Sequence, residues 1–399
     1  MTLSSLQQAR AIARPSREQM LNREFSVQQF WNQNRDLFER AWSEWQTESE
    51  AKLPQLDSSI FDPKLRAAVE QAWADPTTED AVKDLWEEVF PGVYRAQFFD
   101  VERLAALREY LDGVADADIP LRPPYGIVLN RGGAMLDPRS EGYLAAPGFQ
   151  GFYREMMDAY MRPVSRLLFP DVVGYDTQTF GFSIRWQASK DTSLRPHSDA
   201  SAVTLNINLN LPGEGYSGSA VSFIDPVSRR VEKLTFEPGT ALIHHGSVPH
   251  ASEPITEGER YNFVLWLYGQ HGQIPHGSTP TPRISAKDRW SVPTEEFGGI
   301  SPKTCPPVPL SNSERTFLRR PIFTTLPIGA SLSKVQSTMM IPMLQTCGWG
   351  RALFGHSRRV SLTSHLRRQR AAQRSFWRSS KGHIWSGRPK RLLITTNFQ

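Results

Sequence analysis

The stretch Ala202-Val-Thr-Leu-Asn-Ile-Asn-Leu-Asn-Leu211 decides the fold class, because apolar and polar residues alternate along it. Successive side chains of a β-strand point to opposite faces of a sheet, so the alternation predicts a strand whose polar face holds Thr204, Asn206 and Asn208. Such a face either meets solvent or lines an interior that holds a polar ligand. The alternation by itself leaves both interpretations open.

Four more segments of alternating or apolar character lie near this strand, with Gly, Pro, Asn and Ser turns between them. They are Thr179–Trp186, Ala220–Ile224, Thr240–His245 and Tyr261–Tyr268. Short strands divided by turns are typical of an antiparallel sandwich or jelly roll. We therefore expect this part of the chain to form one of these two folds.

The first 90 residues predict helices, because their apolar residues recur at helical spacing. Two such stripes are Phe38, Trp42, Trp45 and Val82, Leu85, Trp86, Val89. Thr77 or Thr78 would cap the second helix. We expect these helices to pack on a neighbouring domain.

Two more helices are expected before the strands. Asp100 opens a short amphipathic helix that Gly113 would end, because glycine readily adopts the left-handed conformation found after a helix. A second helix is expected around Gly151–Leu168. Helices followed by short strands indicate an α+β protein.

Charge divides the 399-residue chain into two parts. Residues 301–399 carry 13 Arg and 4 Lys against the single acid Glu314, a net charge of +16, whereas the first 300 residues carry −11. Beyond Gly272 the apolar periodicity fades into Pro, Ser and Thr-rich sequence. We therefore expect a helical region (1–90), a mixed domain (91–272), an extension (273–300) and a disordered basic tail (301–399).

Composition excludes several classes of protein. Because Cys305 and Cys347 are the only cysteines, neither a disulfide scaffold nor a cysteine metal cluster can underlie the fold, and a reducing compartment fits best. No run of about 18 uncharged apolar residues occurs, so we expect no membrane span. We expect a cytoplasmic or nuclear protein, although the first 17 residues, with three Arg and no acid, also suit a mitochondrial transit peptide.

His197 and Asp199, in Arg195-Pro-His-Ser-Asp199, are two residues apart where a strand begins. Their side chains would leave the same face and could bind one ion. Two histidines and one carboxylate on one face of an octahedron leave three positions open, the arrangement that non-haem Fe(II) oxygenases use. A third ligand, a histidine from another strand, is therefore expected.

Three histidines of Gly239-Thr-Ala-Leu-Ile-His-His-Gly-Ser-Val-Pro-His250 compete for this role, namely His244, His245 and His250. We prefer His250, because Arg260 follows it ten residues later at the start of an apolar strand and would point into the same cavity. His244 and His245 would then make ordinary hydrogen bonds at the end of a strand.

Arg260 has the chemistry to anchor a dicarboxylate. A guanidinium binds a carboxylate through two hydrogen bonds and keeps its charge when buried, which suits the distal carboxylate of 2-oxoglutarate while the 2-oxo acid chelates iron. Thr204 and Asn206 would then also face the keto acid. The alternative is a surface salt bridge between Arg260 and Glu257 or Glu259.

Taken together, these residues resemble the iron- and 2-oxoglutarate-dependent dioxygenase superfamily, within its prolyl and lysyl hydroxylase branch. Further segments resemble the family called 2-oxoglutarate and iron-dependent oxygenase domain-containing protein 2, with its plant relatives linked to chromatin regulation. The matching segments are Pro124-Tyr-Gly-Ile-Val-Leu-Asn-Arg-Gly-Gly133, Tyr160-Met-Arg-Pro163, Leu168-Phe-Pro-Asp171, Val203-Thr-Leu-Asn206 and Gly258-Glu-Arg-Tyr-Asn262. The likeness covers roughly residues 90–270.

The resemblance implies a double-stranded β-helix that binds Fe(II) and 2-oxoglutarate, with L-ascorbate as a reductant. It implies hydroxylation of a C–H bond in a protein or peptide substrate, either at lysine or proline or as demethylation of methyl-lysine. The alternative function is a catalytically inactive dioxygenase fold that binds chromatin or nucleic acid through the basic tail.

The sequence departs from the family pattern at three places. Tyr216-Ser-Gly-Ser219 replaces Phe-x-Gly-Gly before a strand, so the turn there is expected to differ. Many relatives carry a tyrosine about ten residues before the first metal ligand, where this chain has Trp186 and Gln187. The tail after residue 300 has no counterpart in the family.

Overall fold

The strands of the computed structural model form two antiparallel sheets. The structure describes residues 3–22, 24–124, 132–136, 142–190, 193–275 and 284–292. The predicted basic tail and most of the predicted extension therefore lie outside the described residues, as does most of the segment between Pro124 and Gly133. The larger sheet, called the major sheet, has the order β1-β2-β10-β6-β12-β4-β3, and β7 also pairs with β12. The minor sheet has the order β5-β11-β8-β9.

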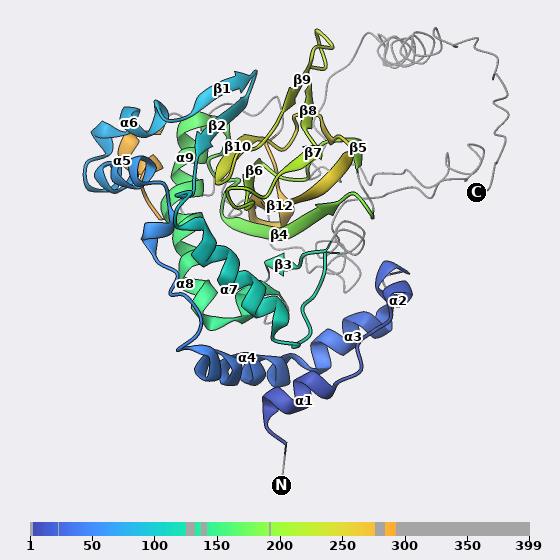
Figure 1. Ribbon diagram of the computed structural model, residues 1–399. Coiled ribbons are helices and arrows are strands. Elements are labelled where there is room, and N and C mark those ends of the chain that lie inside the picture. The colour runs from blue at the N-terminus through green and yellow to red at the C-terminus, as the bar shows by residue number, and fades with distance from the viewer. Residues whose placement is uncertain are drawn as a thin grey trace, which may run out of the picture. The chain divides into compact units, whose positions relative to one another are not determined.

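The strands of the major sheet are β1 (Glu87–Phe90), β2 (Val93–Gln97), β3 (Met135–Leu136), β4 (Gln178–Gln187), β6 (Val203–Asn208), β7 (Tyr216–Gly218), β10 (Thr240–His245) and β12 (Ile255–Tyr268). Those of the minor sheet are β5 (Leu194–His197), β8 (Val221–Ile224), β9 (Val231–Leu234) and β11 (His250–Ser252). Residues of both sheets line one pocket, so the sheets enclose a common interior. This arrangement confirms the predicted jelly roll (Figure 1).

The central strand β6 separates the two environments of the major sheet. Its apolar residues Val203, Leu205 and Ile207 belong to the main hydrophobic core, which also contains helix residues. Thr204 and Asn206 line the pocket between the sheets. The polar face predicted from the alternation therefore points into the interior of the jelly roll and away from bulk solvent.

Helices cover the outer face of the major sheet. The central ones are α7 (Leu104–Asp116) and a continuous run of α8 (Pro147–Glu155), the π-helical turn η4 (Met156–Met161) and α9 (Arg162–Leu168). Phe149 of α8 contacts Phe263 of β12 with ring centroids 6.1 Å apart. The helix expected around Gly151–Leu168 is thus present, and it begins at Pro147.

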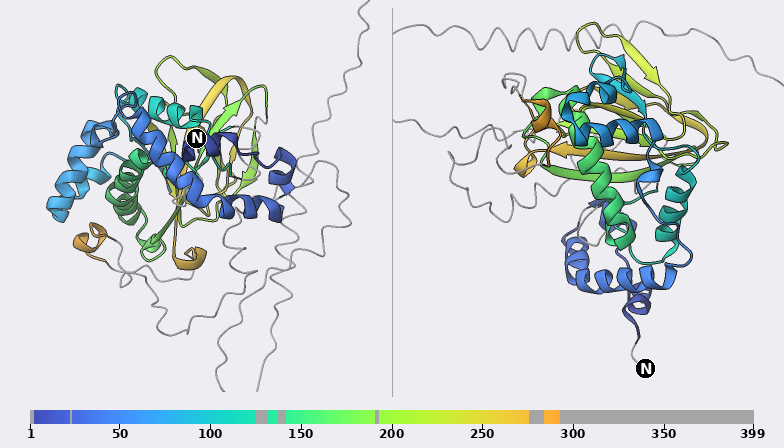
Figure 2. Two further views of the ribbon diagram at one scale, coloured as in Figure 1. Left: turned by 90° about the horizontal axis from the view of Figure 1, so that it is seen from below. Right: turned by 90° about the vertical axis from the view of Figure 1, so that its left-hand side faces the viewer.

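The N-terminal helices are α1 (Ser5–Ala11), α2 (Arg17–Asn22), α3 (Phe25–Gln33), α4 (Arg35–Ser49), α5 (Pro63–Ala74) and α6 (Asp80–Lys83). Figure 2 shows α4 crossing the ends of α7 and α8. There the Tyr110 hydroxyl donates to Gln46 (2.9 Å), and Trp45 meets the Tyr110 ring edge-on. Short 3₁₀ turns are η1 (Ser58–Ile60), η2 (Pro76–Thr78), η3 (Tyr143–Ala145), η5 (Pro170–Val172) and η6 (Gln270–Gly272).

Two sequence-based expectations about helices are wrong. Gly113 lies inside α7, which continues to Asp116. The longer helix is stabilised because Val114 is buried and because Leu53 packs against the Cα of Gly113. The expected helix through Val82 and Val89 ends with α6 at Lys83, and the chain then forms β1. Pairing of β1 with β2 in the major sheet outweighs the helical spacing of these residues.

A short helix after the jelly roll, α10 (Ala286–Arg289), packs on the turn η2 and on α9. Trp290 is buried, and its indole N–H donates to Glu79 (3.0 Å). The Arg166 guanidinium donates to the carbonyl oxygens of Asp288, Arg289 and Ser291. No helix in the described part of the chain is both long and apolar enough to span a membrane.

Candidate metal centre

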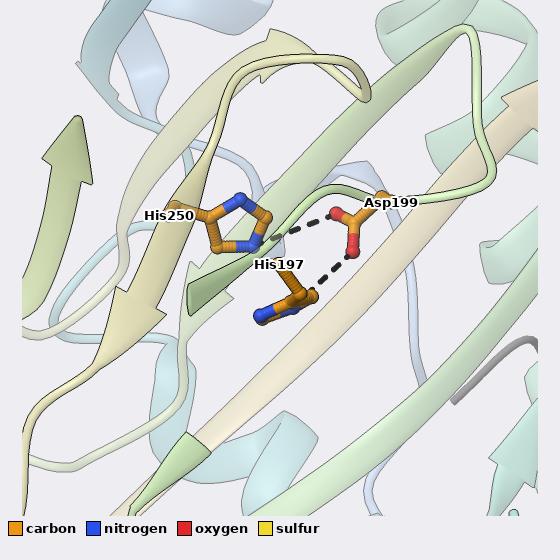
Figure 3. A group of neighbouring side chains, drawn as sticks. All are labelled: His197, Asp199 and His250. Atoms are coloured by element: carbon orange, nitrogen blue, oxygen red, sulfur yellow. Dashed lines mark ion pairs between the residues drawn. The ribbon is translucent and has the colours of Figure 1, made fainter. Parts of the chain in front are cut away.

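Three side chains predicted to bind a metal converge at one end of the minor sheet. His197 ends β5, Asp199 follows two residues later, and His250 begins β11 directly opposite His197 in the strand register. The ligand atoms of the three residues lie within 4.8 Å of one another. His197 Nε2 is 3.6 Å from Asp199 Oδ1, and His250 Nε2 is 3.7 Å from Asp199 Oδ2 (Figure 3).

Backbone carbonyl groups hold both imidazoles in the tautomer that a metal requires. The Nδ1–H of His197 donates to the carbonyl oxygen of Arg195 (2.8 Å), and the Nδ1–H of His250 donates to that of Val248 (3.0 Å). A carbonyl can only accept, so the lone pair of each ring lies on Nε2, the atom that faces Asp199. Burial, with His250 nearby, also lowers the pKa of His197 and favours its neutral, metal-binding form.

His244 and His245 lie on opposite faces of β10. Neither belongs to the group of described side chains whose ligand atoms could hold one ion. His245 lies on the outer face, where Nε2 is 3.3 Å from Asp171 Oδ1 and the ring packs on Phe169. His244 is buried beside His250, and its Nδ1–H donates to the His245 carbonyl. Burial lowers the pKa of His244 to about 3, so the ring stays neutral.

Arg260 lies in the same pocket as the three ligand residues, on the inward face of β12. Its side chain is 1% exposed, and no described carboxylate forms an ion pair with it. The alternative of a surface salt bridge to Glu257 or Glu259 is therefore wrong for this side chain. Burial lowers the pKa of Arg260 to about 10, which still leaves it charged at neutral pH.

The contacts of Arg260 are neutral and incomplete. Its Nη1 donates to the carbonyl oxygen of Ser219, and its Nη2 donates to the Ser252 hydroxyl (2.9 Å). Its Nε is buried without a hydrogen-bond partner among the residues that the structure describes. A buried cation with a free donor is costly unless an anion joins it. This orphaned donor is the feature that fits a ligand carboxylate.

Ser252 and Ser219 were missed by the sequence argument. Ser252 stands two residues after His250 on β11, so the period of two in a strand could have identified it. Ser219 is the last residue of the segment that departs from the family pattern, and both Gly218 (φ 76°) and Ser219 (φ 56°) have left-handed backbones. Trp186, which stands where relatives carry a tyrosine, also lines the pocket. The centroid of its ring is 5.2 Å from the guanidinium carbon of Arg260.

Thr204 and Asn206 line the pocket, but each already has a protein partner. The Thr204 hydroxyl donates to Asp199 Oδ2 (2.6 Å), and the Asn206 amide oxygen accepts from Asn262 (2.8 Å). The remaining wall of the pocket is apolar and includes Phe182, Ile184, Leu194, Val221 and Val264. The pocket thus has a polar end at the three ligand residues, a cationic end at Arg260, and apolar sides.

Two imidazoles and one carboxylate around a single point form the facial triad of non-haem Fe(II) oxygenases. No family model matches the sequence. The predicted resemblance to the iron- and 2-oxoglutarate-dependent dioxygenases is nevertheless confirmed by individual relatives.

The chain is 31% identical over 189 residues to 2-oxoglutarate and iron-dependent oxygenase domain-containing protein 2 of Xenopus tropicalis. This alignment covers 44% of this chain and 48% of that protein. It is 33% identical over 143 residues to multifunctional procollagen lysine hydroxylase and glycosyltransferase LH3 of Rattus norvegicus, covering 34% of this chain and 18% of that protein. A solved prolyl-4-hydroxylase of Pseudomonas putida aligns with a TM-score of 0.33 at 18% identity, over 52% of this chain and 99% of its own.

The chain spans about half the length of several curated relatives that it matches, including the Xenopus protein and domain-containing protein ICU11 of Arabidopsis thaliana. The latter is 26% identical over 224 residues, which cover 52% of each protein. The similarity therefore concerns part of each chain.

Proposed function

We propose that this protein is an Fe(II)- and 2-oxoglutarate-dependent dioxygenase that hydroxylates a C–H bond of a protein substrate. The balanced reaction converts R–H, dioxygen and 2-oxoglutarate into R–OH, succinate and carbon dioxide. Bound Fe(II) and 2-oxoglutarate supply the activation of dioxygen. The residues of this chain hold the metal, orient the keto acid and exclude water.

The observation that carries the proposal is Arg260, a buried guanidinium without a carboxylate partner among the described residues, in the same pocket as His197, Asp199 and His250. The triad would hold Fe(II) from one side and leave three positions for the 2-oxo acid and dioxygen. Arg260 would pair with the distal carboxylate of the keto acid, and Ser252, which accepts from Arg260, keeps its own proton for the same oxygen atoms.

The apolar walls of the pocket would restrict water around the bound keto acid. Phe182 and Val264 come from neighbouring strands of the major sheet, and Val221 comes from the minor sheet. Exclusion of water strengthens the charge pairing at Arg260 and limits side reactions. Asn206 is a candidate for a further hydrogen bond to the cofactor through its amide nitrogen.

A protein substrate is the finer part of the proposal. The name of one relative describes a procollagen lysine hydroxylase, which favours lysine in a peptide, and proline is the second candidate. Demethylation of methyl-lysine would follow from the same hydroxylation, because a hydroxymethyl amine loses formaldehyde. L-Ascorbate is proposed as the reductant that restores Fe(II) after uncoupled turnover.

The decisive experiment adds Fe(II) and 2-oxoglutarate to the purified protein without oxygen and records the visible charge-transfer band of a chelated 2-oxo acid. We expect the band in the full-length protein and its loss in His250→Ala, because one imidazole ligand is missing. Absence of the band in the wild-type protein, with metal binding verified separately, would contradict the proposed cofactor. No substrate is needed.

The alternative is a binding protein whose basic tail carries the function, and the net charge of +16 over residues 301–399 favours it. Clustered Arg and Lys bind polyanions through release of counterions, so the binding weakens steeply with salt. Titration of DNA into full-length protein and into a variant truncated at residue 300, at two salt concentrations, tests this alternative. Salt-sensitive binding that disappears on truncation, together with no charge-transfer band, would favour the binding protein.

A further inference from the structure

Two hydrogen bonds hold Asp199, one at its backbone and one at its carboxylate. Its backbone N–H donates to the carbonyl oxygen of Gly246 (2.8 Å), next to β10. Gly246 itself touches Ser201 so closely that an added Cβ would lie 2.1 Å from the Ser201 carbonyl oxygen. The loop that carries Asp199 is therefore fixed, and rotation of the carboxylate is the freedom that remains.

A chain of two buried hydroxyl groups, those of Ser201 and Thr204, reaches the Asp199 carboxylate. The Thr204 hydroxyl donates to Asp199 Oδ2 (2.6 Å), a length typical of a hydroxyl bound to an ionised carboxylate. The Ser201 hydroxyl lies 2.9 Å from that of Thr204. Because the single proton of Thr204 is given to Asp199, Ser201 must donate to Thr204. Ser201 and Thr204 are 2% and 1% exposed, so water does not compete for these bonds.

We propose that Thr204 is a positioning residue that binds Asp199 Oδ2 and presents Oδ1 as the sole metal-binding oxygen. A carboxylate with two free oxygens can occupy two coordination positions, whereas a carboxylate bound at one oxygen occupies one. Three positions then stay open for the 2-oxo acid and dioxygen. The inference rests on the proposed function. The sequence predicted that Thr204 faces the keto acid, and the inference gives Thr204 a role in positioning a metal ligand.

The test compares Thr204→Val, which removes the hydroxyl and keeps the shape, with Thr204→Ser, which keeps the hydroxyl. Loss of such a supporting hydrogen bond typically weakens metal binding about 10- to 100-fold, so we expect that change in the Fe(II) or Co(II) dissociation constant of Thr204→Val. Thr204→Ser should bind within about threefold of wild type. Isothermal titration under anaerobic conditions, without 2-oxoglutarate, measures both.

A spectroscopic reading separates positioning from general damage. The visible d–d bands of the Co(II) protein report coordination number and should change in Thr204→Val but not in Thr204→Ser. The matched control is Thr240→Val on β10, a buried threonine whose hydroxyl contacts Gln97 away from the metal position. This control should leave metal affinity and the bands unchanged.

Each outcome has a clear meaning. If wild-type protein binds neither metal, the proposed function fails and the role of Thr204 fails with it. If wild-type protein binds metal and Thr204→Val binds equally well with the same spectrum, the role of Thr204 alone is wrong. If Thr204→Ser is as weak as Thr204→Val while Thr240→Val is normal, the methyl group matters and the hydroxyl does not, which also overturns the inference.

Discussion

The two sheets of the jelly roll divide the work of the molecule. The major sheet has strands of up to 14 residues, and its outer face packs with the helices into the main core. The minor sheet has strands of three or four residues, yet two of them carry His197 and His250. Long strands supply stability through buried apolar area, whereas short strands place polar groups at an open end.

The boundary between these roles runs along β12 of the major sheet. On the face of β12 that meets the helices, the main core contains Tyr261, Phe263 and Leu265. On the opposite face, the pocket is lined by Arg260 and Val264. One strand therefore serves stability on one face and ligand chemistry on the other. The following substitutions test how strictly stability and chemistry are separated.

The largest effect is expected at the three ligand residues, two of which lie on the minor sheet. His197→Ala, Asp199→Ala or His250→Ala should abolish conversion of 2-oxoglutarate to succinate, because each removes one of three metal ligands. Thermal unfolding of metal-free His197→Ala and His250→Ala should change little, since both side chains are partly exposed. Succinate assays and melting curves check both statements. Full turnover by His250→Ala would contradict the assignment of the third ligand.

The next effect is on stability and should come from the major sheet. Phe263→Ala should lower the free energy of unfolding by about 3–5 kcal/mol, because a fully buried aromatic ring is replaced by a cavity. Metal affinity of the folded protein should stay the same. The counterpart is Phe223→Ala on β8, whose ring contacts those of His244 and His250. Phe223 is also buried, so denaturant titration should show a loss of stability in both variants. Metal titration should separate them, with weaker metal binding in Phe223→Ala alone, and equal metal affinities in the two variants would contradict the proposed division.

Arg260→Ala should weaken 2-oxoglutarate binding by roughly 30-fold or more, because truncation of a buried charge pair costs about 2–5 kcal/mol. Metal affinity should barely change, since Arg260 does not touch the triad. Calorimetric titration with 2-oxoglutarate in the presence of metal measures the effect. Arg230→Ala, in the exposed turn between β8 and β9, is the control. An unchanged affinity in Arg260→Ala would remove the main argument for this cofactor.

The smallest effect is expected for His245→Ala. This change breaks a partly exposed pair with Asp171 on the outer face of β10, which contributes about 1 kcal/mol or less. Metal affinity and succinate formation should equal those of the wild type. A loss of metal binding comparable to that of His250→Ala would show that the outer and inner faces of β10 are not independent.

Much of the fold was predictable where periodicity extends over six or more residues. β10 spans the predicted residues, and β6 lies within its predicted segment. The four-residue strand β8 was predicted from its apolar residues, whereas β5 and β11 were not, because they are short and mostly polar. Gly113 was misread as a helix end, since local propensity does not register the burial of Val114 by tertiary packing.

The sequence by itself determined which groups are available and which of them share a face. The alternation around Thr204 follows from the period of two in a strand, whereas Asp199 lies in the loop after β5, where that period does not apply. Tertiary structure decided which distant groups meet. It paired His250 with His197 across two short strands and left Arg260 buried without a described counter-ion. Strand pairing and burial join residues far apart in the chain, and local sequence patterns carry no record of those contacts.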